Sequence, residues 1–201
     1  MNPLAHGPPE WASAWGSDDL GVFAGLAVGP LDYLLRWVPP SPHEPLDELR
    51  FSEGFWLGEA PVTWALWEAL GGDPLDRRPD LPATLGLEEC RRFCRVLNLR
   101  VPDLRVRLPG EAEWEYACRA GAPTRLVTAL SEFDGAIDSE GRPVRHQHPN
   151  AWGFYDMLDN VFEWCLGPGE RPRVCGPARW PPELEPPPIV RLGLRLARSF
   201  T

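Results

Sequence analysis

The chain has 201 residues, the size of one domain, and a net charge of −9 without a basic stripe, so we expect no nucleic-acid partner. It begins without the features of a signal peptide and has no apolar run of transmembrane length, so we expect no membrane association. Its five Cys show no secreted spacing pattern, and its basic residues are all Arg, which together favour a cytoplasmic, bacterial protein with reduced thiols.

The chain divides into an N-terminal arm, residues 1–20, and one domain, residues 21–201. In the arm, Trp11 and Trp15 are spaced to pin a short helical turn onto the body. The apolar runs 22–28 and 33–38 predict two strands around a Gly-Pro turn, and residues 51–58 predict a third.

Three helices are predicted next. Thr63 is a suitable N-cap for a helix over 64–70, which a glycine ends. A stripe at helical spacing predicts a second helix over 87–97, and the third, over 111–120, has acidic residues in its first turn. Residues 131–149 are then expected to be a polar loop and 166–188 an irregular Pro-rich run, before a closing strand over 189–198.

Two blocks carry most of the information in this sequence. One runs from Arg107 to Gly121 and reads RLPGEAEWEYACRAG; the other, NAWGFYDM, starts at Asn150 and continues to NVFEW, which ends at Trp164. Together they resemble the two signature blocks of the formylglycine-generating enzyme (sulfatase-modifying factor) family. The resemblance implies an α+β, C-type-lectin-like fold with few helices, small twisted antiparallel sheets and much irregular chain. In the first block, Arg107 is placed to pair with an acidic residue of the following helix.

The resemblance also implies a structural calcium ion. The matching ligands would be Asn160, the backbone of Val161, and Glu163. Asp159 stands where the family has Gly and could add a ligand or disturb the turn. A hydrogen-bonded turn without metal is the alternative.

Three departures separate this chain from the catalytic members. The strand that follows the opening turn in the family is missing between 41 and 51, and VCGPARW at 174–180 replaces an Arg-Gly-Gly-Ser-Trp block. The segment 181–188, where the copper-using enzymes carry two Cys, has neither Cys nor His. Copper is therefore not expected at that place, because carboxylates and prolines do not replace soft thiolates.

The remaining Cys and His candidates point mainly to structure. Cys90 and Cys94 share a helix face but also its apolar stripe, which favours a core role over a metal. Cys118 and Cys165 are expected in the core as well. Cys175 is the one thiol near the groove the family uses, and is the catalytic candidate if the protein is an enzyme. The pair His146 and His148 is half of a metal site at most, and an exposed loop is expected instead.

Intact scaffold blocks beside a missing catalytic segment favour a non-catalytic module that binds a protein or peptide partner. Its predicted surface contains Arg173, Cys175, Arg179 and Trp180. Two alternatives stay open. One is a copper- or iron-dependent oxidase of a protein cysteine, using Cys175 with another thiol brought near by folding. The other is a diversified ligand-binding protein of a retroelement system. The sequence leaves the oligomeric state open.

Overall fold

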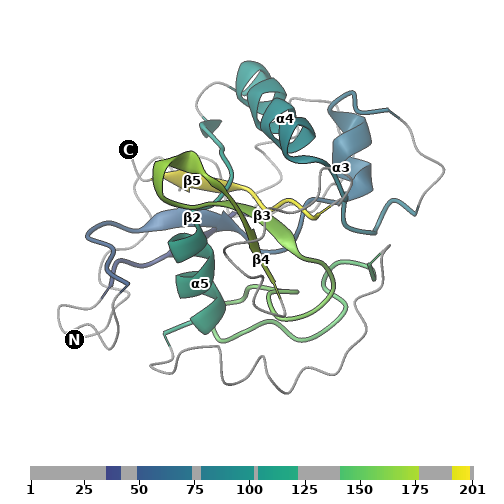
Figure 1. Cartoon of the computed structure of the whole chain (residues 1–201). Coiled ribbons are helices and arrows are strands. Elements are labelled where there is room, and N and C mark those ends of the chain that lie inside the picture. The colour runs from purple at the N-terminus through teal and green to yellow at the C-terminus, as the bar shows by residue number, and fades with distance from the viewer. Residues whose placement is uncertain are drawn as a thin grey trace.

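The computed structural model describes residues 35–41, 49–73, 78–101, 104–121, 141–176 and 192–199. The predicted arm, the first predicted strand and most of the polar loop lie outside these ranges. Within them the architecture is mixed: three α-helices surround two small antiparallel sheets, with long stretches of irregular chain between them (Figure 1). This is the α+β organisation that the sequence predicted.

The larger sheet has three strands in the order β1 (Leu35–Val38), β2 (Phe55–Gly58) and β5 (Ala197–Ser199). Trp37 lies opposite Trp56 in the β1–β2 register. The predicted strand over 51–58 begins later than expected, because residues 52 and 53 form a bend. Gly54 follows that bend with the Trp37 ring directly over it; a Cβ there would lie 2.2 Å from the ring, so the close approach needs a glycine.

The second sheet is a hairpin of β3 (Glu163–Leu166) and β4 (Pro172–Cys175). The predicted irregular run over 166–188 is wrong for residues 172–175, which form β4. The 3₁₀ turn η2 (Pro168–Glu170) reverses the chain, with Gly169 at a φ of 67°. The hairpin closes through the bond from the Gly167 N–H to the Arg171 carbonyl, 2.8 Å long. The prolines around this short strand obscure the alternating pattern from which strands are predicted.

Three helices match their predicted positions: α3 (Trp64–Ala69), α4 (Leu87–Arg100) and α5 (Glu111–Arg119). Thr63 caps α3 through its Oγ1, 3.3 Å from the Leu66 nitrogen, as expected. The helix α4 runs three residues past its predicted end at 97. Asn98 holds that last turn by bonding both the N–H and the carbonyl of Val106, at 2.7 and 2.8 Å.

The first turn of α5 confirms the predicted capping network. The Glu113 carboxylate accepts from the Gly110 N–H at 2.7 Å and pairs with both terminal nitrogens of Arg107, at 2.6 and 2.7 Å. Glycine at the N-cap offers no side-chain acceptor, so the carboxylate at the third helical position satisfies the free N–H instead.

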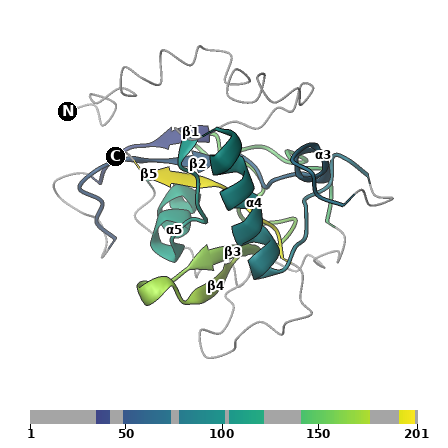
Figure 2. The same cartoon turned by 90° about the horizontal axis from the view of Figure 1, so that it is seen from above.

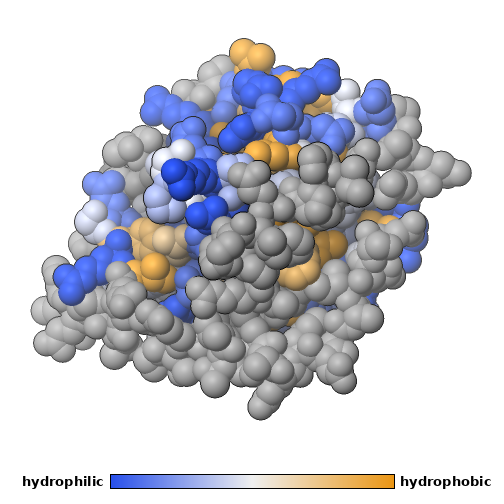
Figure 3. Space-filling view, in the orientation of Figure 1, coloured by the Kyte–Doolittle hydropathy of each residue, from blue (hydrophilic) through white to orange (hydrophobic). Residues whose placement is uncertain are grey.

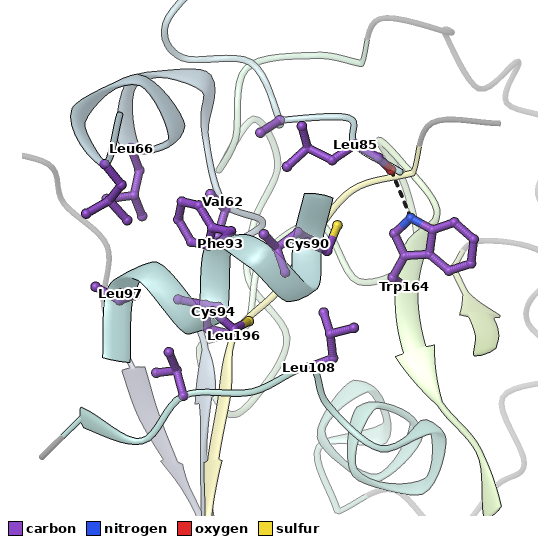
Figure 4. Close-up of a cluster of buried hydrophobic side chains, with 14 of the residues drawn as sticks. Val62, Leu66, Leu85, Cys90, Phe93, Cys94, Leu97, Leu108, Trp164 and Leu196 are labelled. Atoms are coloured by element: carbon purple, nitrogen blue, oxygen red, sulfur yellow. Dashed lines mark hydrogen bonds between the residues drawn. The ribbon is translucent and has the colours of Figure 1, made fainter. Parts of the chain in front are cut away.

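Two buried clusters form the core. The larger one packs α3 and α4 against the chain around Leu85 and the closing segment, and includes Trp164 (Figure 4). The smaller one lies between α5, the β1–β2 strands and the hairpin, whose strands lie beside α5 in both views (Figure 2). Hydrophilic residues gather on the outside over α4 (Figure 3). In the part of the chain described, no helix is long and apolar enough to cross a membrane.

Candidate functional site

A buried ion pair joins the two signature regions to the end of the chain. Glu163 and Arg195 are both fully buried, with Nη2 2.8 Å from Oε1 and Nε 2.9 Å from Oε2. The indole of Trp114, from α5, donates to the same carboxylate at 2.9 Å. The charges cancel and each carboxylate oxygen has a donor, which is what burial of an ion pair requires.

Arg195 also donates hydrogen bonds to two backbone carbonyl groups. Its Nη1 donates to the Gly58 carbonyl and its Nη2 to the Tyr155 carbonyl, each at 2.9 Å. One guanidinium therefore connects the end of β2, the second signature block and β3. The sequence analysis placed this arginine only as part of an alternating strand and missed its burial. The signal was a single Arg between two leucines in LGLRLA and a single Glu between Phe162 and Trp164, because a charge buried among apolar residues needs a partner.

A tight acidic turn precedes β3. Asp156 and Asn160 both adopt positive φ, 56° and 71°. Asn160 is held by Arg142, whose N–H it accepts at 2.7 Å and whose carbonyl it bonds at 3.0 Å. Asp156 accepts from the Arg145 N–H through Oδ2 at 2.7 Å. The turn is thus folded around carboxylate and amide oxygens.

Two carboxylate oxygens of this turn are buried with no hydrogen-bond partner: Oδ1 of Asp156 and Oδ2 of Asp159. The residues are 4% and 8% exposed. Burial raises the pKa of both carboxyls, and the charge of Asp159 raises that of Asp156 further, while Arg195 and the Arg145 N–H oppose the rise. For Asp159 the opposing groups are Arg142 and His146. Such oxygens are what a hard cation would take.

The side-chain oxygens that remain available to a calcium ion differ from the ligands predicted from the sequence. Both oxygens of Glu163 and the side-chain oxygen of Asn160 already accept hydrogen bonds from the protein. The unpartnered oxygens belong instead to Asp156 and Asp159, and the second stands where the family has Gly. Among the described residues no group of three or more His, Cys, Asp or Glu side chains has the geometry of a metal site. The calcium ion stays a prediction, with its best-fitting side-chain ligands moved to these two aspartates.

The cysteines lie in the core. All five are buried, as expected for Cys90, Cys94, Cys118 and Cys165. Cys175, predicted to face a partner and to be the catalytic residue if the protein is an enzyme, is buried instead: the residue is 8% exposed and packs in the smaller cluster. The reason is that β4, the strand missed in the sequence, turns its side chain inward toward α5. Cys165, on β3, lies in the same cluster and is a diagonal neighbour of Cys175 in the β3–β4 register.

Of the residues predicted to face a partner, Arg173 is the one the structure places at the surface. It lies on β4 with its side chain 26% exposed, and its Nε is 3.6 Å from the Glu111 carboxylate of α5. Arg179 and Trp180 lie outside the described residues, and Cys175 is buried, so the structure does not bring the four together. His146 and His148 are exposed in a loop, as predicted.

A small α+β domain, held by a buried arginine–glutamate pair and without extensive sheets, is the C-type-lectin-like class of protein that the sequence blocks implied. The model of the sulfatase-modifying factor enzyme 1-like domain matches residues 36–168. The chain therefore belongs to the formylglycine-generating enzyme family.

The relatives found are similar over short segments. The formylglycine-generating enzyme of Bos taurus is 27% identical over 133 residues, which is 55% of this chain and 33% of that protein. That of Streptomyces coelicolor is 32% identical over 81 residues, covering 29% of this chain and 25% of the relative. A protein of Chlamydia caviae named serine/threonine-protein kinase pkn1 is 40% identical over 63 residues, 29% of this chain and 10% of its own length. The chain thus matches a third or less of these proteins.

A solved structure agrees at the level of the fold. The crystal structure of CarF has a TM-score of 0.56 and 16% identity, covering 85% of this chain and 98% of that one. The structure of PvdO from Pseudomonas aeruginosa has a TM-score of 0.48 and 20% identity, covering 84% and 91%.

Proposed function

We propose that this chain is a binding module built on the formylglycine-generating enzyme scaffold, and that it recognises a protein or peptide partner. The observation that carries the proposal is the position of Cys175. Chemistry on a partner's cysteine needs a thiol that is accessible and ionised, whereas this one is buried and burial raises its pKa. The scaffold around it keeps its ion pair, caps and two cores.

The surface proposed for the partner is Arg173 with the chain that follows β4, in which Arg179 and Trp180 are the residues best suited to anchor an interface. The Arg173 side chain is 26% exposed, and its Nε is 3.6 Å from the Glu111 carboxylate, which is too long for a strong pair. Its Nη1 donates to the Pro172 carbonyl at 3.1 Å, so the guanidinium can exchange the Glu111 carboxylate for one on a partner at little cost while that bond remains.

The relatives support a modular role. A segment of 63 residues similar to part of this chain makes up 10% of a protein whose name says that it is a serine/threonine-protein kinase. We infer from this that the scaffold is used as a module, and loops on a stable core are the usual place for recognition.

The test is selection of a displayed random-peptide library on the immobilised chain. The affinity of the selected peptides is then measured for the wild-type chain, for Arg173→Glu and for the double variant Arg179→Ala/Trp180→Ala. Arg91→Glu is the matched control, because it reverses a partly exposed arginine on the distant outer face of α4. We expect affinity to fall at least tenfold in the first two variants and to be unchanged in the control. Equal binding by the wild-type chain, the two test variants and the control would exclude this surface as the peptide-binding site.

A second function is favoured by one contact: folding brings Cys165 against Cys175, so the second thiol that an oxidase would need is present. In this alternative the two sulfurs would hold copper(I), which prefers soft ligands. Copper-loaded protein would then convert the cysteine of a peptide to formylglycine in air, seen by mass spectrometry. Cys175→Ser should abolish the product and Cys94→Ser should not; a product that survives Cys175→Ser excludes this version.

We also propose that Asp156 and Asp159 hold a structural calcium ion together with backbone oxygens near Val161. Two buried carboxylate oxygens without donors support it. The ion would neutralise the turn and fix its two positive-φ residues, and would take no part in chemistry.

A further inference from the structure

Two thiols from neighbouring strands meet inside the hairpin. In the β3–β4 register Cys165 lies opposite Arg173, and Cys175 lies opposite Glu163. Each cysteine lies two residues along its strand from the residue opposite the other cysteine. Cys165 and Cys175 are therefore diagonal neighbours, and their side chains point to the same face of the hairpin. Both residues lie in the smaller core cluster.

We propose that Cys165 and Cys175 are a redox-active dithiol that closes to a disulfide when peroxide or a small-molecule disulfide reaches the protein. With hydrogen peroxide, the Cys175 sulfur attacks one oxygen and the O–O bond breaks, giving a sulfenic acid and water. The Cys165 sulfur then displaces the hydroxyl as a second water, and the S–S bond forms. Two thiols lose two electrons, and the peroxide gains them. The proposal does not depend on any partner.

The contact between the thiols distinguishes their roles. Burial raises the pKa of both thiols; the neighbouring Cys165 opposes that rise in the pKa of Cys175, while Cys175 adds to the rise in the pKa of Cys165. Cys175 is also the more exposed residue, at 8% against 0%. It is therefore the attacking residue, and Cys165 resolves the intermediate. Because burial opposes ionisation, the reaction will be slow.

The hairpin can supply the movement that the bond needs. Diagonal residues of an antiparallel pair have Cα atoms roughly 7–8 Å apart, whereas a disulfide requires about 4.4–6.8 Å. Among the described strands, β4 pairs only with β3, and the ladder is four residues long. A small slide of this short strand breaks few hydrogen bonds, so closure does not require the rest of the fold to open.

A third thiol competes. Cys118, on α5, is close enough to Cys175 for the charge of one to raise the pKa of the other. Cys118 lies on α5, whereas Cys165 lies on the strand paired with β4 and on the same face as Cys175, which makes the strand pair the preferred one. Cys90 and Cys94, four apart on α4, form a second buried pair in the other cluster and serve as an internal control.

The experiment treats the native full-length chain with hydrogen peroxide, or separately with oxidised glutathione. Remaining thiols are blocked with an alkylating reagent in denaturant, and the digest is mapped by mass spectrometry. We expect one dominant cross-link, between Cys165 and Cys175, which dithiothreitol reverses. Cys90, Cys94 and Cys118 should be recovered as alkylated thiols, and circular dichroism of the same sample should remain that of the folded protein.

Two variants keep the proposal testable. Cys118→Ser should form the same bond at the same rate. Cys165→Ala lacks the resolving thiol, so Cys175 should accumulate instead as sulfenic acid with peroxide or as a glutathione adduct. A dominant bond between Cys118 and Cys175 would overturn the proposal. Recovery of Cys165 and Cys175 as thiols in a sample in which Cys90 and Cys94 are already oxidised would also overturn it. The same holds if Cys165 and Cys175 remain thiols after prolonged exposure of the folded chain to either oxidant.

Discussion

Arg195 and Glu163 face each other with no solvent-exposed surface on either side chain, and their closest atoms are 2.8 Å apart. They come from segments 32 residues apart in the chain: Glu163 begins β3, and Arg195 lies just before β5. Removing one charge leaves the other buried and unpaired, and that cost is far larger than the net value of the pair.

Glu163→Gln should therefore lower the free energy of unfolding by about 3–5 kcal/mol, measured by urea denaturation. The matched control is Glu88→Gln, which removes an exposed partner of Arg91 and should cost about 0.5 kcal/mol. Adding Arg195→Met to Glu163→Gln should recover part of the loss, because no buried charge remains. A double variant as unstable as the sum of the singles would contradict this account.

Calcium should stabilise the chain through the acidic turn. At a concentration 100-fold above its Kd, calcium is expected to raise the thermal midpoint by roughly 5–10 °C. Asp156→Ala and Asp159→Gly should each abolish the shift, since each removes a buried oxygen that has no other partner. Asp80→Ala, an exposed carboxylate paired with Arg78, is the control and should keep it. A shift that survives both turn variants would place the ion elsewhere.

The buried thiols should make the protein sensitive to alkali. Burial raises the pKa of Cys94 to about 12, so its thiol ionises in the unfolded chain near pH 8.5 but not in the folded one. A raised folded-state pKa gives stability that is complete below the unfolded pKa and is lost as pH rises toward 12. Each such thiol steepens the loss by about 1.4 kcal/mol per pH unit.

Cys94→Ala should accordingly flatten the decline in unfolding free energy between about pH 9 and 11 by that amount. Urea unfolding over a pH series measures the slope. Asp80→Asn carries no such group and should leave the slope unchanged. If Cys94→Ala also leaves it unchanged, the thiol ionises in the folded state as it does in water.

Two buried indoles offer a matched comparison. Trp164 donates to the Leu85 carbonyl and Trp114 to the Glu163 carboxylate, both at 2.9 Å (Figure 4 shows the first). Both variants lose the same ring volume. In addition, Trp164→Phe should lower the free energy of unfolding by about 0.5–1.5 kcal/mol, because it loses a neutral hydrogen bond. Trp114→Phe should lower it by about 1.5–3 kcal/mol, because it loses a bond to a charge. Equal costs would mean that the Glu163 charge is already satisfied by Arg195 alone.

Local signals predicted the helices well. Thr63 marked the start of α3, the stripe of Cys90, Phe93 and Cys94 marked α4, and the acidic first turn marked α5. Each of these depends on residues within one or two turns of each other, so the chain near the helix contains the information. The end of α4 was missed because Asn98 bonds to Val106, a contact that closes only after the chain has turned back.

The hairpin and the acidic turn show the opposite case. No alternation marks β4, whose first residue is Pro172, and only pairing with β3 makes it a strand. The oxygens available to calcium could not be chosen from the sequence either. Glu163 had the right type and position, but its carboxylate is taken by Arg195, 32 residues later.

The sequence alone determined the family, the α+β class, the three helices and the burial of most thiols, because blocks, caps and periodic apolar residues act over short distances. Tertiary structure decided which charges pair, which carboxylates stay without donors, and which two of five thiols touch. Those relations join residues far apart in the chain, and their energies depend on the exclusion of water, which exists only once the chain has folded.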